Sequence, residues 1–307
     1  MALVRTTSLT KRYVRVTALD SLNLELEPGV TGLVGANGAG KSTLIKILVG
    51  LLEPSQGSAE VMGFDVVTRG PDIRQYVGYM PEHDCLPTDV SATEFVAHMA
   101  QISGLPRAAA RERTAETLRH VGLFEERYRE MRGYSTGMKQ RVKLAQALVH
   151  DPRLMLLDEP TIGLDPEGRE EMLRLIRRIG TEFGIAIILS SHLLSEIEQV
   201  CDHLVEIEDG RLVRSSPMSA LTGLTRILQI EVEGDGDRLA ALLSARGIPV
   251  SRSGRQILVE KKDDAILDAI RDAVVELDLG LVRLAQSRRR LEDLFEPAPS
   301  AVNSLDV

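Results

Sequence analysis

Residues 30–42 of this chain are VTGLVGANGAGKS, an apolar run that leads into a glycine-rich loop. The apolar residues Val30, Leu33 and Val34 at the start of this stretch predict a short buried strand over 30–34. After the loop, apolar side chains recur at helical spacing and predict a helix over 41–52. They are Leu44, Ile45, Leu48 and Leu52. A strand, a glycine-rich loop and a helix in this order predict one unit of an α/β fold.

The loop matches the phosphate-loop pattern in full, with Gly-Lys-Ser at its end. Its backbone N–H groups and the helix dipole are expected to converge on phosphate groups, while Lys41 reaches the β and γ phosphates and Ser42 offers a hydroxyl group to Mg²⁺. The residues expected to contact the nucleotide here are Gly35, Ala36, Asn37, Gly38, Ala39, Gly40, Lys41, Ser42 and Thr43. A chance match occurs in about one chain in a hundred of this length, before its position between strand and helix is considered.

Two carboxylates follow another apolar run. Leu154–Leu157 contains no polar residue, and Asp158 and Glu159 come directly after it. Together with the apolar run Ile185–Leu189, this pattern is typical of a parallel sheet covered by helices on both faces. Ligands of such sheets bind at the carboxyl ends of the strands. We therefore expect Asp158 to hold Mg²⁺ through water and Glu159 to act as general base; the alternative is that both are solvated loop residues.

Two further segments show sequence patterns of their own. Residues 21–27 alternate between apolar and polar, which predicts a half-buried strand and a β layer at the start of the chain. Ser91 and Glu94 have the spacing of a capping box, which predicts a helical segment from Ser91 to about Met131.

Shorter elements follow Pro217. They predict a small α+β domain of ferredoxin-like organisation at 221–296, followed by a frayed tail at 297–307. The expected strands cover 227–232 and 256–260, and the expected helices cover 238–246 and 263–277.

Composition excludes several classes of protein. The 307 residues are 43% hydrophobic and 27% charged, without an apolar run of the roughly 18 residues that a membrane span needs. With 37 basic and 45 acidic side chains, the net charge is −8. The chain therefore lacks the excess of basic residues that is typical of nucleic-acid binders. Cys85 and Cys201 have no metal-like spacing, which favours inert thiols in a reducing compartment. The polar first residues lack the apolar core of a signal peptide, so we expect a cytosolic chain.

Residues 134–141, YSTGMKQR, resemble the signature motif of the ATP-binding-cassette (ABC) ATPases. The resemblance covers about residues 3–216 and points to ATP-binding subunits of the drug, antibiotic-resistance, sodium and gliding-motility class of exporters. It implies an ATPase that uses ATP and Mg²⁺, with a phosphate-loop α/β core over 1–216 and a helical subdomain at about 88–150. The C-terminal α+β domain resembles the accessory domain of the same class.

The family resemblance also implies a dimer. In the family, the signature of one protomer covers the γ-phosphate held by the other, so that two nucleotides are enclosed head to tail. Ser135, Gly137 and Met138 would complete the partner's site, and Asp165 would touch that site from a loop that crosses the interface. From the residues alone, Ser135 is also the N-cap of the next helix, whose N-terminus can attract an anion.

Two more residues are placed by the resemblance. His192 follows the last apolar run and would hydrogen-bond the γ-phosphate and orient the attacking water as a second catalytic residue. Tyr13 would stack on adenine. The alternatives are a purely structural histidine and a tyrosine on a strand surface.

The sequence departs from the family pattern at two places. Glu82 stands where most members have a glutamine that contacts Mg²⁺ and water. Its carboxylate can still coordinate Mg²⁺ together with Ser42 and Asp158, although it adds negative charge near the phosphates. Thr136 and Met138 replace the commoner glycine and glutamine, as they do in the exporter class.

Partners follow from the same resemblance. The insert at about 88–131 receives a coupling helix of a membrane subunit in the family, so a separate integral-membrane permease is implied, with the ATPase as a homodimer or paired with a sibling ATPase. The implied location is the cytoplasm, peripheral on the inner face of the cell membrane. The alternative is a soluble ABC ATPase that acts on ribosomes or DNA without a permease. No nucleic-acid partner is expected, and the basic run 288–290 is interpreted as a solvated helix face.

Overall fold

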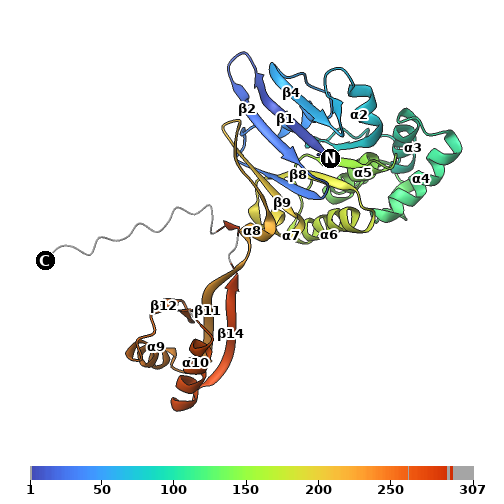
Figure 1. Cartoon of the computed structure of the whole chain (residues 1–307). Helices are drawn as coiled ribbons and strands as arrows, with labels where there is room; N and C mark the ends of the chain where they lie inside the picture. The colour runs from blue at the N-terminus through green and yellow to red at the C-terminus, as the bar shows by residue number, and fades with distance from the viewer. Residues whose placement is uncertain (1, 262, 289–290, 293–307) are drawn as a thin grey trace. The chain divides into compact units, whose positions relative to one another are not determined.

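The computed structural model describes residues 2–261, 263–288 and 291–292, and the chain divides into two compact units, Met1–Met218 and Ser219–Val307 (Figure 1). The expected tail at 297–307 lies outside the described residues, as do Arg289 and Arg290 of the basic run. The first unit carries every residue singled out above for nucleotide chemistry.

A six-stranded sheet of order β10-β9-β3-β8-β7-β6 forms the centre of the first unit, and its strands from β9 to β6 are parallel. The strands are β10 (Arg211–Pro217), β9 (His203–Glu208), β3 (Val30–Val34), β8 (Ala186–Ser191), β7 (Leu154–Leu157) and β6 (Val77–Met80). Every residue of β3, β7 and β8 is buried, which confirms the predicted parallel sheet covered on both faces. β8 extends beyond the apolar run to Ser190 and Ser191, whose buried hydroxyl groups are hydrogen-bonded.

Helix α1 (Lys41–Leu48) begins directly after the glycine-rich loop and buries its apolar face in the core. It ends at Leu48 rather than at Leu52, because Gly50 adopts a positive φ of 71° and turns the chain out of the helix. Three more helices of this unit are α2 (Gly70–Tyr76), α6 (Pro166–Glu182) and α7 (Leu194–Val200), while α8 (Met218–Leu221) spans the boundary of the two units.

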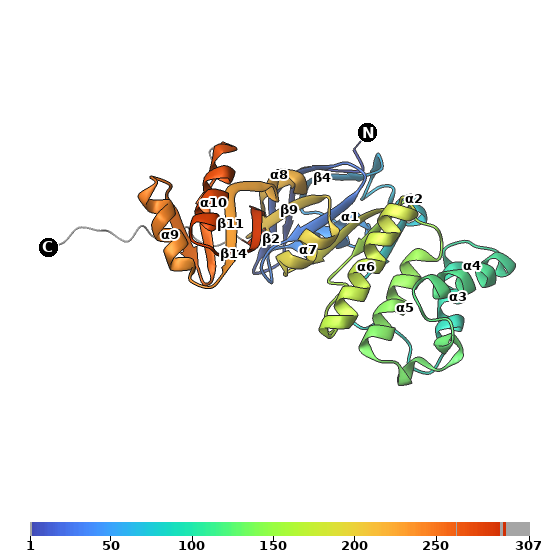
Figure 2. The ribbon, with the colours of Figure 1, turned by 90° about the horizontal axis from the view of Figure 1, so that it is seen from below.

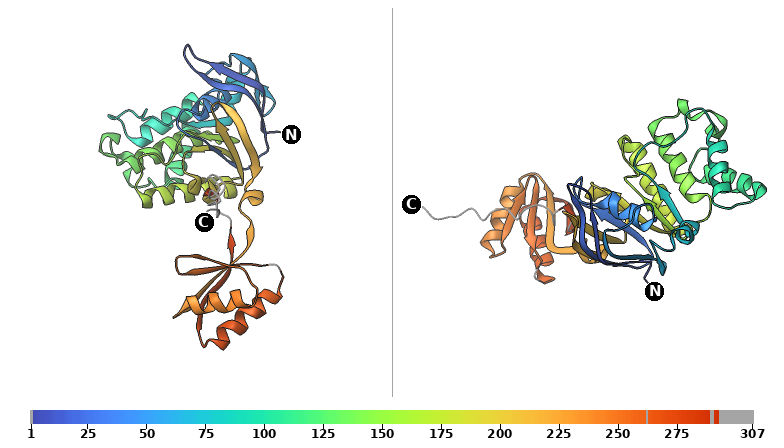
Figure 3. Two further views of the ribbon diagram at one scale, coloured as in Figure 1. Left: turned by 90° about the vertical axis from the view of Figure 1, so that its left-hand side faces the viewer. Right: turned by 90° about the horizontal axis from the view of Figure 1, so that it is seen from above.

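An antiparallel layer of order β2-β1-β4-β5 contributes to the same apolar core as α1. Its strands are β1 (Val4–Arg12), β2 (Thr17–Leu26), β4 (Gln56–Val61) and β5 (Phe64–Asp65). The predicted N-terminal β layer is confirmed, but the strand expected at 21–27 is only the end of β2. Ala18 and Leu19 are both buried, so the period of two holds only from Leu22 onward. In Figure 3 the blue strands of this layer lie away from the green helices of the next segment.

The helical segment consists of α3 (Ala92–Ile102), α4 (Arg107–His120) and α5 (Thr136–Leu148), which Figure 2 shows gathered together, with short 3₁₀ turns at Glu126–Tyr128 and Met131–Gly133. The capping box is confirmed, because the Glu94 N–H donates to Ser91 Oγ at 3.2 Å and the Ser91 N–H donates to the Glu94 carboxylate at 2.9 Å. The helical segment expected from Ser91 to about Met131 consists of two helices and two 3₁₀ turns rather than one continuous helix. Gly104, with φ of 98°, and Pro106 break the segment between α3 and α4.

The second unit has the order β11 (Leu224–Glu233), α9 (Gly236–Ala245), β12 (Val250–Ser253), β13 (Gln256–Glu260), α10 (Ala265–Glu276) and β14 (Gly280–Arg288). Its antiparallel sheet has the order β12-β13-β11-β14, which is the ferredoxin-like arrangement. The sequence prediction missed β12 and β14. Three of the four residues of β12 are exposed, so that strand lacks an apolar pattern.

Candidate nucleotide-binding site

A cavity of about 340 Å³ lies in the first unit, where parallel strands end and the glycine-rich loop begins. The loop and the start of α1 form one wall, and residues that follow β6, β7 and β8 form the others. The lining residues are Asn37, Gly38, Gly40, Lys41, Ser42, Thr43, Glu82, Glu159, Ile162 and His192. Nine of these ten were predicted as nucleotide contacts, metal ligands or catalytic residues, and only Ile162 was not predicted.

The loop requires glycine where its backbone passes close to neighbouring strands. At Gly40, φ is 109°, and a Cβ atom would lie 2.4 Å from the carbonyl oxygen of Ala18. At Gly35, a Cβ atom would lie 2.2 Å from the carbonyl oxygen of Ile207. Any larger residue at either position would therefore displace the loop.

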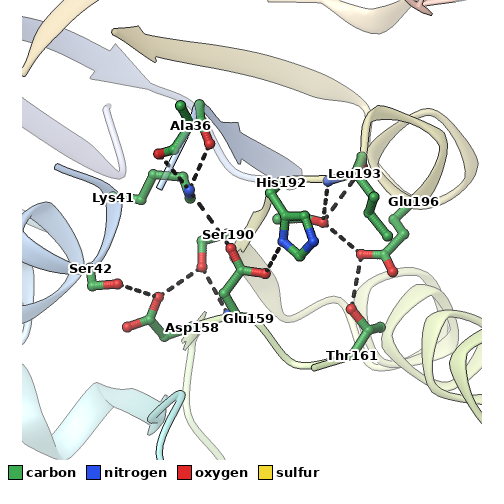
Figure 4. A network of polar contacts seen from close by, with 12 residues as sticks. Ala36, Lys41, Ser42, Asp158, Glu159, Thr161, Ser190, His192, Leu193 and Glu196 are labelled. Carbon is green, nitrogen blue, oxygen red and sulfur yellow. Dashed lines mark hydrogen bonds and ion pairs between the residues drawn. The ribbon is translucent and has the colours of Figure 1, made fainter. Parts of the chain in front are cut away.

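Lys41 is 6% exposed, and its ammonium group is surrounded by oxygen atoms (Figure 4). Nζ donates to the carbonyl oxygens of Gly35, at 2.7 Å, and Ala36, at 3.3 Å. It also lies 3.7 Å from Oε1 of Glu159. A buried cation needs such partners, and the same position suits contact with an anionic ligand in the cavity.

Asp158 is 1% exposed and accepts two hydrogen bonds at Oδ1, from Ser42 Oγ at 2.9 Å and from Ser190 Oγ at 2.8 Å. The Glu159 N–H donates to Ser190 Oγ at 2.9 Å, so one serine links both acidic residues. The Ser42 hydroxyl and the Asp158 carboxylate are hard oxygen donors and fit Mg²⁺, which keeps several waters and takes phosphate oxygens as further ligands. Ser190 was missed in the sequence prediction, although it directly precedes the Ser191-His192 pair.

Glu159 has a left-handed backbone with φ of 48° and is 7% exposed. Its Oε2 atom lies 2.9 Å from Nδ1 of His192, whose side chain is 49% exposed. A non-glycine residue in this conformation costs free energy and persists only where neighbouring contacts hold it. The structure thus brings the two predicted catalytic residues into direct contact, with Lys41 on the other carboxylate oxygen.

Glu82 follows β6 and lines both this cavity and a neighbouring one of about 300 Å³. Its backbone oxygen accepts a hydrogen bond of 2.9 Å from Nζ of Lys143 in α5. Lys143 is 2% exposed, and burial lowers its pKa. The sequence offered no signal for this contact, because the two residues are joined only by the fold.

The signature residues line a different cavity of about 630 Å³. Ser135 is the N-cap of α5, and its Oγ accepts from the Met138 N–H at 3.3 Å. Asp165 is the N-cap of α6 and accepts from the Gly168 N–H at 3.3 Å. Ser135, Gly137, Met138 and Asp165 all line this cavity, which shares no lining residue with the phosphate-loop cavity.

Tyr13 lies in the turn between β1 and β2 and is 48% exposed. Its N–H donates to the carbonyl oxygen of Val16 at 2.7 Å, and Nζ of Lys11 lies 5.6 Å from the ring centroid. It is not among the residues that line the phosphate-loop cavity. The stacking role of Tyr13 stays a prediction.

A glycine-rich loop at a helix N-terminus, next to a buried aspartate at a strand end, defines the class of phosphate-loop nucleotide-binding proteins. The family model described as ABC transporter matches residues 19–162. The bacitracin transport ATP-binding protein BcrA of Bacillus licheniformis is 40% identical over 220 residues, which cover 71% of this chain and 71% of that protein. The chain belongs to the ABC transporter family and is an ABC-type ATPase.

Two further comparisons agree with this assignment. The Nod factor export ATP-binding protein I of Cupriavidus metallidurans is 34% identical over 236 residues, which cover 76% of this chain and 78% of that protein. The solved structure of cbiO1 from Clostridium perfringens, part of the ABC transporter complex cbiONQ, has a TM-score of 0.65 and 28% identity, and the match covers 71% of this chain and 90% of that one. In the part of the chain that the structure describes, no helix is long and apolar enough to span a membrane.

Proposed function

We propose that the chain is the ATP-hydrolysing subunit of an exporter, and that two cassettes close around Mg-ATP to drive a separate integral-membrane permease. The observation that carries this proposal is the separation of the signature cavity from the phosphate-loop cavity within one chain. A single copy therefore offers two incomplete sites. A second copy, or a sibling ATPase, turned head to tail would complete both.

In the phosphate-loop cavity, the loop N–H groups and Lys41 bind the β and γ phosphates. Ser42, Asp158 and Glu82 would hold Mg²⁺, which would neutralise part of the charge of the phosphates. Glu159 accepts a proton from the attacking water as general base, and His192 orients that carboxylate and contacts the γ-phosphate. The contacts from Lys41, Ser190 and His192 keep the Glu159 carboxylate and backbone in one geometry. Tyr13 stacks on the adenine ring.

In the second cavity, Ser135, Gly137 and Met138 lie at the N-terminus of the 13-residue helix α5. The free N–H groups and the dipole of such a helix attract an anion. The anion in this proposal is the γ-phosphate held by the other copy. Asp165, which lines the same cavity, contacts the opposite site through the dimer interface.

The exporter role is supported by the similarity to the Nod factor export ATP-binding protein I and by the Ser-Thr-Gly-Met form of the signature. The helical segment α3–α5 would receive the permease. This arrangement puts the ATPase in the cytoplasm, on the inner face of the cell membrane. Co-purification with a multispanning membrane protein is the expected result, whereas recovery of ribosomes would favour the soluble alternative.

Glu159→Gln tests the proposal in the isolated full chain. The variant keeps the shape of the side chain but loses the base, so we expect hydrolysis to slow about 10²–10⁴-fold while ATP binding persists. Size-exclusion chromatography in saturating Mg-ATP should show a stable dimer. Glu112→Gln is the matched control, because Glu112 lies exposed on α4. A Glu159→Gln variant that stays monomeric would contradict the proposal.

A further inference from the structure

Glu196 in α7 is a buried carboxylate, 3% exposed, at a junction of three elements (Figure 4). Its Oε2 atom accepts hydrogen bonds from Thr161 Oγ1 at 2.9 Å and from Ser191 Oγ at 2.6 Å. Its Oε1 atom lies 3.3 Å from Nε of Arg169 in α6. A carboxylate buried at this depth is tolerated only where charge and hydrogen-bond partners surround it.

Two of the three partners lie in the segments that bear the proposed catalytic groups Glu159 and His192, and the third lies in α6, close to Asp165. Thr161 lies in the loop that runs from Glu159 to Asp165, and that loop borders both cavities. Ser191 directly precedes His192. Arg169 lies in the first turn of α6, and its backbone N–H donates to the carbonyl oxygen of Asp165 at 2.9 Å.

One oxygen atom of Glu196 thus joins the loop after β7 to the end of β8. Ser191 Oγ also accepts from the Leu193 N–H at 3.0 Å, which fixes the backbone on both sides of His192. We call residues 159–165 the Thr161 loop. A displacement of this loop would move Glu196 and so strain the hydrogen bond from Ser191, the residue before His192.

We propose that Glu196 is a positioning residue that couples the Thr161 loop to the contact between His192 and Glu159. Through Glu196, contacts that Gly163, Leu164 and Asp165 make in the signature cavity affect the positions of His192 and Glu159 in the phosphate-loop cavity. This inference rests on the proposed function of His192 and Glu159. It adds a means by which closure on a second copy reaches the hydrolytic groups.

Thr161→Val tests the coupling, because valine keeps the volume of threonine and removes only the hydroxyl donor. Loss of a hydrogen bond to a charged group should lower kcat about tenfold. The KM and the dissociation constant for ATP should stay within about twofold, because the phosphate-loop contacts do not change. Thr161→Ser restores the donor and should restore kcat. Ser191→Ala, which removes the other donor, should give the same split between kcat and KM.

Thr114→Val is the matched control. Thr114 in α4 is 0% exposed, and its hydroxyl group has no hydrogen-bond partner among the residues that the structure describes. The same substitution there should leave kcat unchanged, so it separates the effect of the junction from the general effect of replacing a buried threonine.

The double variant Thr161→Val/His192→Ala decides whether Thr161 acts through the histidine. The inference predicts that the double variant is no slower than His192→Ala alone. Multiplicative losses, an equal loss of ATP affinity, or no rescue by Thr161→Ser would overturn it. Normal turnover of Thr161→Val and Ser191→Ala beside a slow His192→Ala would overturn the inference alone. Normal turnover of His192→Ala would overturn the proposed role of His192 and this inference with it.

Discussion

Nδ1 of His192 lies 2.9 Å from Oε2 of Glu159, so the residue after β8 holds the carboxylate that follows β7. The other carboxylate oxygen lies 3.7 Å from Nζ of Lys41. Parallel neighbouring strands end at the same edge of the sheet, and this is why residues distant in sequence meet here. The carboxylate therefore has one defined position at the edge of the phosphate-loop cavity.

Loss of this contact should slow hydrolysis without preventing ATP binding. We expect His192→Ala to lower kcat by at least about tenfold, because the Glu159 carboxylate loses the group that orients it. Steady-state ATPase assays and equilibrium binding of ATP measure the two effects separately. His98→Ala, at an exposed position of α3, should behave as wild type. Equal turnover of both variants would remove His192 from the mechanism.

Lys41→Ala should lose nucleotide affinity, because in the proposed mechanism the ammonium group of Lys41, which lines the cavity, binds the phosphates. We expect the dissociation constant for ATP, measured by titration calorimetry, to rise at least about tenfold. Lys46→Ala changes a lysine on the same helix that does not line the cavity, and should bind ATP normally. Unchanged binding by Lys41→Ala would place the triphosphate elsewhere.

Glu82→Gln should change the magnesium dependence of the ATPase. A carboxylate oxygen attracts Mg²⁺ more strongly than an amide oxygen does, so its removal should raise the half-saturating Mg²⁺ concentration several-fold. A Mg²⁺ titration at fixed ATP measures the shift, with Glu112→Gln as the control for loss of a glutamate charge. Identical titration curves for wild type and Glu82→Gln would exclude Glu82 as a metal ligand.

His150 should make the fold sensitive to acid. Burial lowers the pKa of His150, and its Nε2 atom lies 3.3 Å from the carbonyl oxygen of Val77. The unfolded chain therefore takes up the proton first as the pH falls, so stability is complete above about pH 6.5 and is lost as the pH falls toward the lowered pKa.

His150→Gln removes this group and should reduce the fall in Tm between about pH 7 and pH 5. Thermal melts across this range measure the effect, with the exposed His98→Gln as the control. If the two variants lose equal Tm on acidification, His150 does not contribute to the pH dependence.

Local pattern predicted the parts of the site that are contiguous in sequence. The glycine-rich loop, Lys41 and Ser42 lie within one stretch, and Asp158 and Glu159 follow an apolar run with no polar interruption. The parallel sheet follows from the same apolar runs. The signature residues were found through a family motif rather than through periodicity.

Contacts across the fold were not predictable in this way. The bond from Ser190 to Asp158 and the one from Lys143 to Glu82 join residues 32 and 61 positions apart. Neither residue type signals such a contact, and Glu196 has the sequence pattern of a solvated helix acid although it is buried. Strand order and burial determine these contacts, and a local sequence pattern predicts neither of them.

In the proposed dimer, each hydrolytic site takes its phosphate loop from one copy and its signature from the other. Lys41→Ala damages the first, and Gly137→Asp damages the second by placing a carboxylate at the N-terminus of α5, where a Cβ atom has only ordinary contacts with Leu164 and Ser135. Each variant alone should be inactive. In an equal mixture, half of the dimers contain both variants and each of these has one intact site, so activity should return to about a quarter of that of wild type. A mixture as inactive as its components would contradict the account.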